Sequence, residues 1–178
     1  MSTSNPSEFS TSINPYIRDY CHSMRGKGLT NFVHDITFGF GEISMLMADA
    51  EMYLFYYDNK IPIACTDDSG RTLPEGIYIN KTMAHNHREY SKLISLFHNT
   101  ARKKGLNYGR NAVHYVTREQ DCQHLYTLFF DFSDHDFLHF VVNNGALIQD
   151  MIDHYTLTAK DIILEAKSVE NRIVLPYC

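Results

Sequence analysis

The sequence predicts an α+β domain in which helices pack on an antiparallel sheet of four or five strands. Two observations predict this class. Strand-like segments occur in pairs joined by short turns, which is typical of antiparallel hairpins. Amphipathic helical segments precede, separate and follow these pairs, and the last of them is long. The chain has 178 residues, which is enough for one domain with a substantial core.

The composition excludes several classes of protein. Hydrophobic residues make up 44% and charged residues 21%, so the chain is neither disordered nor fibrous. A net charge of -5 gives no electrostatic reason for these residues to bind nucleic acid. No apolar run approaches the ~20 residues of a membrane helix. The first residues lack the basic and apolar regions of a secretory signal, so we expect a cytoplasmic protein.

The N-terminal region predicts a tail followed by a helix. Residues 1–12 are rich in Ser and Thr, and we expect a disordered tail. Ile13, Ile17 and Tyr20 recur at helical spacing, which predicts a helix over residues 13–24.

A hairpin and a short helix are expected next. Residues 32–47 contain two strand-like runs, and Gly39 to Gly41 supply the turn. A Tyr-rich helix follows over residues 50–58. Residues 61–76 are rich in Pro, Gly and Asp, which indicates loops, and residues 76–79 predict a short strand.

The second half of the chain contains the clearest β signal. An amphipathic helix is expected over residues 88–104, with Gly105 ending it. Residues 111–118 predict a strand, residues 119–122 a turn, and a second strand continues to Phe132.

The last helix is expected to be long. Apolar residues keep one face from residue 134 to residue 168. About 33 residues span ~50 Å, whereas a globule of this size is only ~40 Å across. The helix must therefore kink or project, and Asn143 to Gly145 is the natural break. Residues 169–178 then predict the start of a linker to an output domain that is absent here.

Histidine pairs are the first candidates for chemistry. His85 and His87 flank a single residue, and His135 and His139 have the spacing of metal ligands on a helix. Neither pair has the glutamate of a zinc-protease helix. The alternative for each is an imidazole that hydrogen-bonds locally, and we expect no metal and no cofactor.

Catalytic signatures are missing from the sequence. No Gly-x-Ser-x-Gly elbow and no phosphate-binding glycine loop occurs. Cys65, His85 and Asn86 would form a hydrolase site only if the fold assembled them, so we expect no enzyme. The four cysteines lack metal-finger spacing and are expected to be free thiols. Asp131 is open to three interpretations: a solvent-facing group, a helix cap or a ligand anchor.

Five segments are informative when the order of elements is considered with them. They are Tyr56-Tyr57, Pro74-Glu-Gly-Ile-Tyr-Ile79, Leu128-Phe-Phe-Asp-Phe132, the helix from Phe140 to Lys167, and Arg172-Ile-Val-Leu-Pro176. Together they resemble the N-terminal sensing regions of LuxR-type helix-turn-helix transcription regulators. The resemblance is closest to a subgroup associated with intracellular gammaproteobacteria such as Legionella.

The resemblance implies an α-β-α sandwich related to PAS and GAF sensors, formed here by residues 13–168. It implies an unknown small molecule bound between the sheet and one helical layer, a homodimer, and DNA contact only through a missing C-terminal domain. The acyl-homoserine-lactone receptors of this class carry Trp. This chain has none, so that ligand is not carried over.

Aromatic side chains are the candidates for the ligand site, because a Tyr combines apolar surface with one hydroxyl. The candidate ligand-binding residues are Tyr53, Tyr56, Tyr57, Tyr78, His114, Tyr126 and Phe130. For each of them the alternative is core packing.

Two other functions remain open from the sequence alone. A stand-alone interaction module would expose an apolar patch to a protein partner. A Cys/His hydrolase would place Cys65 within hydrogen-bond reach of a histidine.

Overall fold

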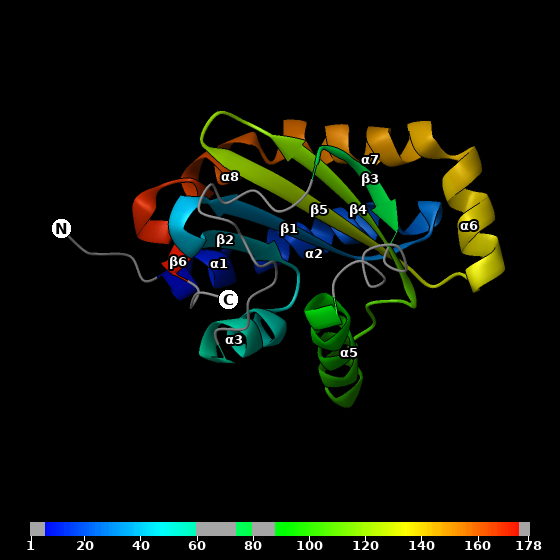
Figure 1. Ribbon diagram of the computed structural model, residues 1–178, viewed down its shortest axis with the longest axis horizontal. Helices are drawn as coiled ribbons and strands as arrows, with labels where there is room; N and C mark the ends of the chain where they lie inside the picture. Colours follow the sequence, from blue (N-terminus) through cyan, green and yellow to red (C-terminus); the bar gives the residue numbers. More distant parts are fainter. Residues whose placement is uncertain (1–5, 60–73, 80–87, 175–178) are drawn as a thin grey trace.

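The structure is a computed structural model that describes residues 6–59, 74–79 and 88–174. These residues form one antiparallel sheet of six strands in the order β3-β4-β5-β1-β2-β6 (Figure 1). The strands are β1 (Leu29–Phe38), β2 (Glu42–Met47), β3 (Gly76–Ile79), β4 (Asn111–Arg118), β5 (Cys122–Phe130) and β6 (Ile173–Val174). The predicted α+β class with an antiparallel sheet is confirmed, although the described strands number six rather than four or five.

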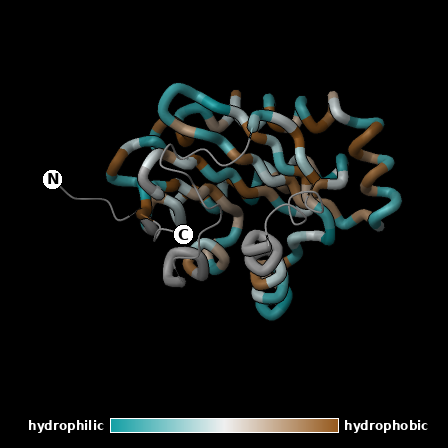
Figure 2. The backbone as a smooth tube through the Cα atoms, in the orientation of Figure 1, coloured by the Kyte–Doolittle hydropathy of each residue, from teal (hydrophilic) through white to brown (hydrophobic). Residues whose placement is uncertain are grey.

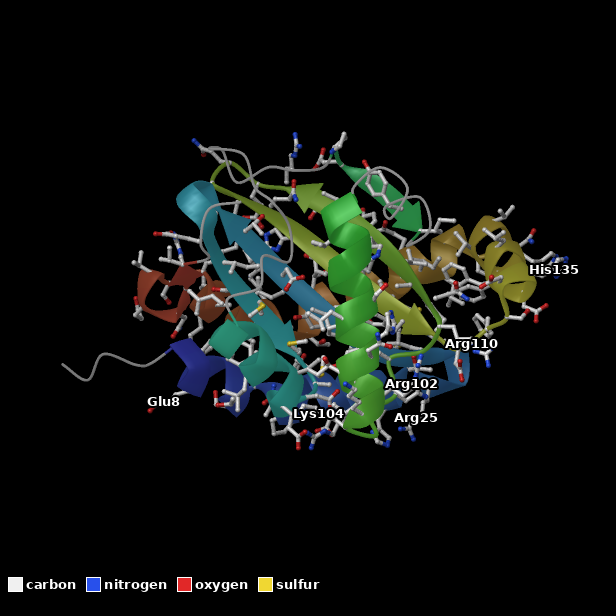
Figure 3. The ribbon with its side chains drawn as sticks, turned by 60° about the horizontal axis from the view of Figure 1, so that its bottom comes forward. Glu8, Arg25, Arg102, Lys104, Arg110 and His135 are labelled. Carbon is white, nitrogen blue, oxygen red and sulfur yellow. The ribbon has the colours of Figure 1, made fainter. Side chains whose placement is uncertain are left out.

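Helices lie on both faces of this sheet (Figure 1). The helices are α1 (Pro6–Ser12), α2 (Asn14–Ser23), α3 (Ala50–Asn59), α5 (Arg88–Lys103), α6 (Asp134–Asn143), α7 (Gly145–Thr158) and α8 (Lys160–Ala166). Residues of α1, α2, α6, α7 and α8 pack on one face, which we call the α7 face. Residues of α3 and α5 pack on the other, the α5 face, which comes forward in Figure 3.

Strand alternation divides the side chains between these two faces. On β1, Phe32, His34 and Ile36 belong to the α7 face, and Val33 and Asp35 belong to the α5 face. Both sets are buried because helices cover both sides of the central strands. This explains why β1 and β5 are almost continuously buried, rather than half exposed.

The α7 face holds the larger apolar core. Phe32 lies at its centre, with its ring centroid 4.5 Å from that of Tyr155 on α7 and 5.0 Å from that of Tyr20 on α2. The hydroxyl of Tyr20 donates to the backbone oxygen of Met151 at 2.7 Å, which joins the two helices. Apolar residues recur along α6 to α8, as the brown segments of Figure 2 show.

The core of the α5 face is smaller. Tyr53 of α3 and Phe97 of α5 pack there against the sheet, and Phe97 stacks on Phe129 of β5 with centroids 5.9 Å apart. Met45 and Met47 of β2 are also buried in this core.

The predicted elements agree with the structure over most of the described residues. Both hairpins are present, as β1–β2 and β4–β5. The predicted helices over residues 13–24, 50–58 and 88–104 are confirmed as α2, α3 and α5. Gly105 follows α5 with a φ of 72°, the left-handed conformation expected of a residue after a helix. The predicted loops over residues 61–73 lie outside the described residues.

The N-terminal region differs from the prediction of a disordered tail. Pro6–Ser12 form α1, and Phe9 is buried in the α7-face core. The sequence did not predict this helix because Phe9 is the one aromatic residue of the segment, so no apolar residue recurs there at helical spacing.

The long C-terminal helix is broken twice. The predicted break at residues 143–145 is confirmed, since Asn144 has non-helical angles and separates α6 from α7. Figure 1 shows α6 turning sharply away from the line of α7. A second break at Ala159, which the sequence pattern did not predict, separates α7 from α8. Phe137 and Ile148 still share one core, as the unbroken apolar pattern predicted.

Residues 169–174 were expected to start a linker, but they pack on the domain. Ile173–Val174 form the edge strand β6 beside β2. The guanidinium of Arg172 lies 3.7 Å from the ring centroid of Phe38 and donates to Glu42 Oε2 at 2.8 Å. The hydroxyl of Ser44 donates to the backbone oxygen of Ala166 at 2.6 Å. These contacts fix the end of α8 against the sheet.

Among the described helices, none has both the length and the apolar character needed to cross a membrane.

Candidate functional site

The predicted ligand-binding residues whose side chains the structure describes lie on both faces of the sheet. Tyr53 belongs to the α5-face core, whereas Tyr126 and Phe130 belong to the α7-face core. Tyr78 and His114 are register partners on β3 and β4, and alternation places both on the α5 face. The sheet therefore separates these five residues into two groups. Tyr56 and Tyr57 lie on α3, with side chains outside the part that the structure describes.

Tyr126 and Phe130 take part in core packing. The ring of Tyr126 stacks on the imidazole of His34 with centroids 4.3 Å apart. Phe130 is fully buried against Phe137 and Phe140 of α6. Both residues match the alternative interpretation given for them.

The α5 face contains a group of buried polar side chains on β1, β4 and β5. We call this group the polar floor; its members are Asp35, Thr37, His114, Gln123 and Thr127. Register explains their proximity, because Thr37 pairs with Gln123 and Thr127 pairs with His114. Asp35 lies two residues from Thr37, so Gln123 is its diagonal neighbour, at ~7–8 Å between Cα atoms.

Asp35 is the most unusual member of the polar floor. Its side chain is buried, and its Oδ1 atom has no hydrogen-bond partner among the described residues. Burial raises the pKa of its carboxyl group to about 7. A carboxyl in this position exchanges its proton near neutral pH, which is uncommon for an aspartate.

Gln123 repeats this pattern on the next strand. It is buried, and its Oε1 atom also has no hydrogen-bond partner within the described ranges. An unsatisfied buried polar atom costs ~1–3 kcal/mol. Folded proteins contain few such atoms, and each requires an explanation such as a bound water or ligand. Two on one sheet face mark this region as the strongest candidate binding surface.

His114 is a neutral member of the same surface. Its Nδ1 lies 3.1 Å from Thr127 Oγ1, and burial lowers its pKa to about 4. The imidazole is therefore uncharged at neutral pH and acts as a hydrogen-bonding group. Of the predicted residues, His114, Tyr53 and Tyr78 share this face, and the sequence did not indicate Asp35 or Gln123. Polar residues inside strand-like runs were the available signal for both.

A second polar cluster lies on the α7 face. Tyr155 Oη is 3.1 Å from His34 Nδ1, and His34 Nε2 is 2.9 Å from His124 Nδ1. His124 Nε2 in turn lies 2.9 Å from Glu119 Oε1, and Lys167 contacts the other oxygen of that carboxylate. A continuous chain of contacts therefore leads from α7 to the end of α8.

The charge states along this chain follow from burial. Burial and the neighbouring His124 hold the pKa of His34 well below its usual value. Burial also lowers the pKa of His124, although Glu119 opposes this shift. Burial is the largest influence on Glu119 and raises its pKa, but the hydrogen bonds and charges of Lys167 and His124 together outweigh burial, and the net shift is downward. The cluster thus pairs neutral imidazoles with an ionised carboxylate.

Three metal-binding atom types meet at one end of this cluster. Glu119, Cys122 and His124 each offer one ligand atom, and these atoms all lie within 4.8 Å of one another. Cys122 and His124 are buried, and Glu119 is exposed. The available sequence signal was Glu-x-x-Cys-x-His across the β4–β5 turn, which contains one histidine and so differs from the two histidine pairs.

The other candidates for chemistry are placed as follows. His135 and His139 are exposed on α6, outside the group of metal-binding atoms found among the described residues. Asp131 is exposed and lies 3.7 Å from Arg110 Nε, which agrees with a solvent-facing group. Ser133, rather than Asp131, caps α6. Cys65, His85, Asn86 and His87 lie outside the described residues.

No family model matches this chain, and no curated protein matches its sequence.

Proposed function

We propose that this chain is the small-molecule-sensing domain of a LuxR-type transcription regulator, with a PAS- or GAF-like α-β-α sandwich. The polar floor supports this proposal more than any other feature. Two of its buried oxygen atoms, Asp35 Oδ1 and Gln123 Oε1, have no hydrogen-bond partner in the described part of the chain, as expected of a surface that binds polar groups in an apolar setting.

The chemistry of the polar floor restricts the ligand. Gln123 Oε1 accepts hydrogen bonds, and Asp35 Oδ1 accepts them when its carboxyl group is ionised, so a matching ligand supplies N–H or O–H donors. The buried polar and charged residues of the described part of the chain include no Lys and no Arg. Against these described residues a phosphorylated or carboxylated ligand would be buried without a cation, which is unfavourable. Tyr53, Met45 and Met47 supply apolar surface beside the floor. The proposed ligand is a neutral or cationic amphipathic molecule.

The signal would leave through the C-terminal helices. Binding changes an equilibrium only by favouring one arrangement of the protein over another. In this proposal the preferred arrangement of α7 and α8, and of a homodimer formed through them, is transmitted to a DNA-binding domain. Leu157 of α7 and Leu164 of α8 support a dimer interface on these helices, because the two apolar residues are 77% and 69% exposed.

The experiment is a thermal-unfolding screen of amphipathic amines, amides and alcohols against the chain. A ligand present at ~100 times its Kd stabilises by about 2.7 kcal/mol. For a domain of this size the shift in Tm is roughly 5–10 °C. Asp35→Asn and Gln123→Leu should each reduce the shift, and the exposed Asp131→Asn should not. A hit whose shift survives both floor substitutions would contradict the proposed site.

The second candidate function is an interaction module without a small ligand. The exposure of Leu157 and Leu164 favours it equally. Sedimentation of the wild type and of a Leu157→Glu, Leu164→Glu variant separates the two. A monomeric wild type that gains no stability from any compound would favour the module over the sensor.

A further inference from the structure

We propose that Glu119, Cys122 and His124 form a zinc-binding site at the β4–β5 turn, on the face of the sheet opposite the polar floor. The ligand atoms are Glu119 Oε1, Cys122 Sγ and His124 Nε2. This site is independent of the sensing function proposed above, because it rests on different residues and a different face.

The distances between these atoms suit one tetrahedral ion. Cys122 Sγ lies 3.5 Å from His124 Nε2, and Glu119 Oε1 lies 2.9 Å from the same nitrogen. Zinc bonds of ~2.3 Å to sulfur and ~2.0–2.1 Å to nitrogen and oxygen, at tetrahedral angles, separate ligand atoms by ~3.3–3.6 Å. The sulfur–nitrogen distance already fits, the oxygen–nitrogen distance is short by a few tenths of an ångström, and the sulfur–oxygen distance is within 4.8 Å.

The local fold brings these residues together. Cys122 and His124 are two residues apart on β5, so alternation points both toward the α7 face. The backbone N–H of Glu119 donates to the carbonyl of Cys122 at 2.9 Å, which closes the turn. This hydrogen bond brings Glu119 close to Cys122 and His124. The rigid hairpin therefore fixes all three residues.

A second layer of contacts orients His124 for an ion. Metal-binding histidines almost always donate their other ring N–H to a neighbouring acceptor. His124 Nδ1 faces His34 Nε2 at 2.9 Å, and His34 Nδ1 faces Tyr155 Oη at 3.1 Å. With an ion on His124 Nε2, each imidazole donates from Nδ1, to His34 and to Tyr155 respectively. Without an ion the same chain runs in the opposite direction and ends at Glu119.

Zinc is the ion that this donor set favours. A thiolate, an imidazole and a carboxylate suit a borderline-soft ion, whereas calcium and magnesium prefer oxygen ligands. Three protein ligands leave a fourth position for water. Glu119 is about half exposed and the other two ligands are buried, so the ion enters from the side of Glu119. On binding, the Cys122 S–H bond breaks and its proton passes to solvent, the proton of the His124 imidazole moves from Nε2 to Nδ1, and Zn–S and Zn–N bonds form.

Lys167 is the competing cation at this site. It contacts Glu119 Oε2, which leaves Oε1 to the ion but adds a positive charge nearby. Replacing it with an uncharged residue should therefore strengthen zinc binding.

The test is a titration of the full chain, purified in chelator and then dialysed free of it, with Zn²⁺ by calorimetry and with Co²⁺ by absorption. We expect one ion per chain and a thiolate-to-cobalt charge-transfer band. Cys122→Ser should abolish the band, and His124→Asn should weaken zinc binding at least ~10-fold. Lys167→Met should tighten it.

Two matched controls address other thiols and histidines. Cys21→Ser removes a buried thiol of the α7-face core, and His135→Asn removes an exposed imidazole of α6, so neither should change binding. A wild type that binds neither metal would overturn the proposal. It would also be overturned by a cobalt band that persists in Cys122→Ser, or by zinc binding that is lost on His85→Asn and unchanged in His124→Asn.

Discussion

His34 and His124 lie on neighbouring strands with 2.9 Å between Nε2 of the first and Nδ1 of the second. Because one of these nitrogens must donate and the other accept, a single proton lies between the two rings. Both imidazoles are buried, and Tyr155 and Glu119 occupy the outer ends of the pair. The two rings therefore depend on their partners at each end for complete hydrogen bonding.

Removing the outer partner on α7 should be costly. Tyr155→Phe leaves His34 Nδ1 buried with its observed partner removed, and we expect a loss of ~1–3 kcal/mol in the free energy of unfolding. Urea denaturation measures it. Tyr78→Phe is the matched control, because the Tyr78 hydroxyl donates to Pro74 in an exposed bond. Equal effects of the two substitutions would contradict a special role for the His34 contact.

Asp35 should make the protein less stable as pH rises. Its pKa is about 7 in the fold and ~3.9 in the unfolded chain, so the folded state binds more protons between these values. The stability that its protonated form provides is complete below ~4 and is lost as pH rises through about 7, by up to about 4 kcal/mol. Asp35→Asn should remove this loss.

The comparison is the difference in unfolding free energy between wild type and Asp35→Asn, measured at about pH 5 and about pH 8. The variant should gain on the wild type at the higher pH. Asp131→Asn, at an exposed position, should show no such change. A difference independent of pH would show that Asp35 is ionised in the fold throughout.

His114 should have the opposite pH dependence. Its pKa falls from 6.5 to about 4 on folding, so the unfolded chain binds more protons between these values. Its contribution is fully present above 6.5 and is lost as pH falls toward about 4. We expect His114→Asn to flatten the decline in Tm over this range. An NMR titration of the His114 ring with a midpoint near its usual pKa would contradict this prediction.

Gly109 should tolerate no side chain. Its φ is 67°, and an added Cβ would lie 2.5 Å from the backbone oxygen of Phe130 and 2.9 Å from Thr30 Oγ1. Gly105 has a similar φ of 72° with nothing within 4 Å of an added Cβ. Gly105→Ala should therefore cost only ~1 kcal/mol, from the left-handed conformation. Gly109→Ala should cost a further ~1–3 kcal/mol from the steric clash, measured by chemical denaturation.

The sequence predicted local structure well where periodicity was strong. Residues such as Ile17, Phe97 and Leu128 recur at spacings that only one kind of element satisfies, and α2, α5 and β5 formed there. The edge strand β6 was missed because two residues give no periodic signal. Its formation depends on pairing with β2, a contact that spans about 130 positions of the sequence.

The candidate site was harder to predict than the fold. Tyr126 and Tyr53 are equally aromatic in sequence, yet the sheet places them on opposite faces. Asp35 and Gln123 are ordinary polar residues until burial removes their water. Only the three-dimensional arrangement shows that one oxygen atom of each has no hydrogen-bond partner among the residues that the structure describes.

The pairing of β1 with both β2 and β5 has a consequence for biosynthesis. β1 lies between β2, which follows it directly, and β5, which leaves a ribosome roughly ninety residues later. Until β5 is available, the β1–β2 hairpin exposes the edge of β1 and the apolar surface of Phe32 and Ile36. We expect nascent chains of intermediate length to depend on chaperones, because such long-range pairing forms slowly and unpaired edges aggregate.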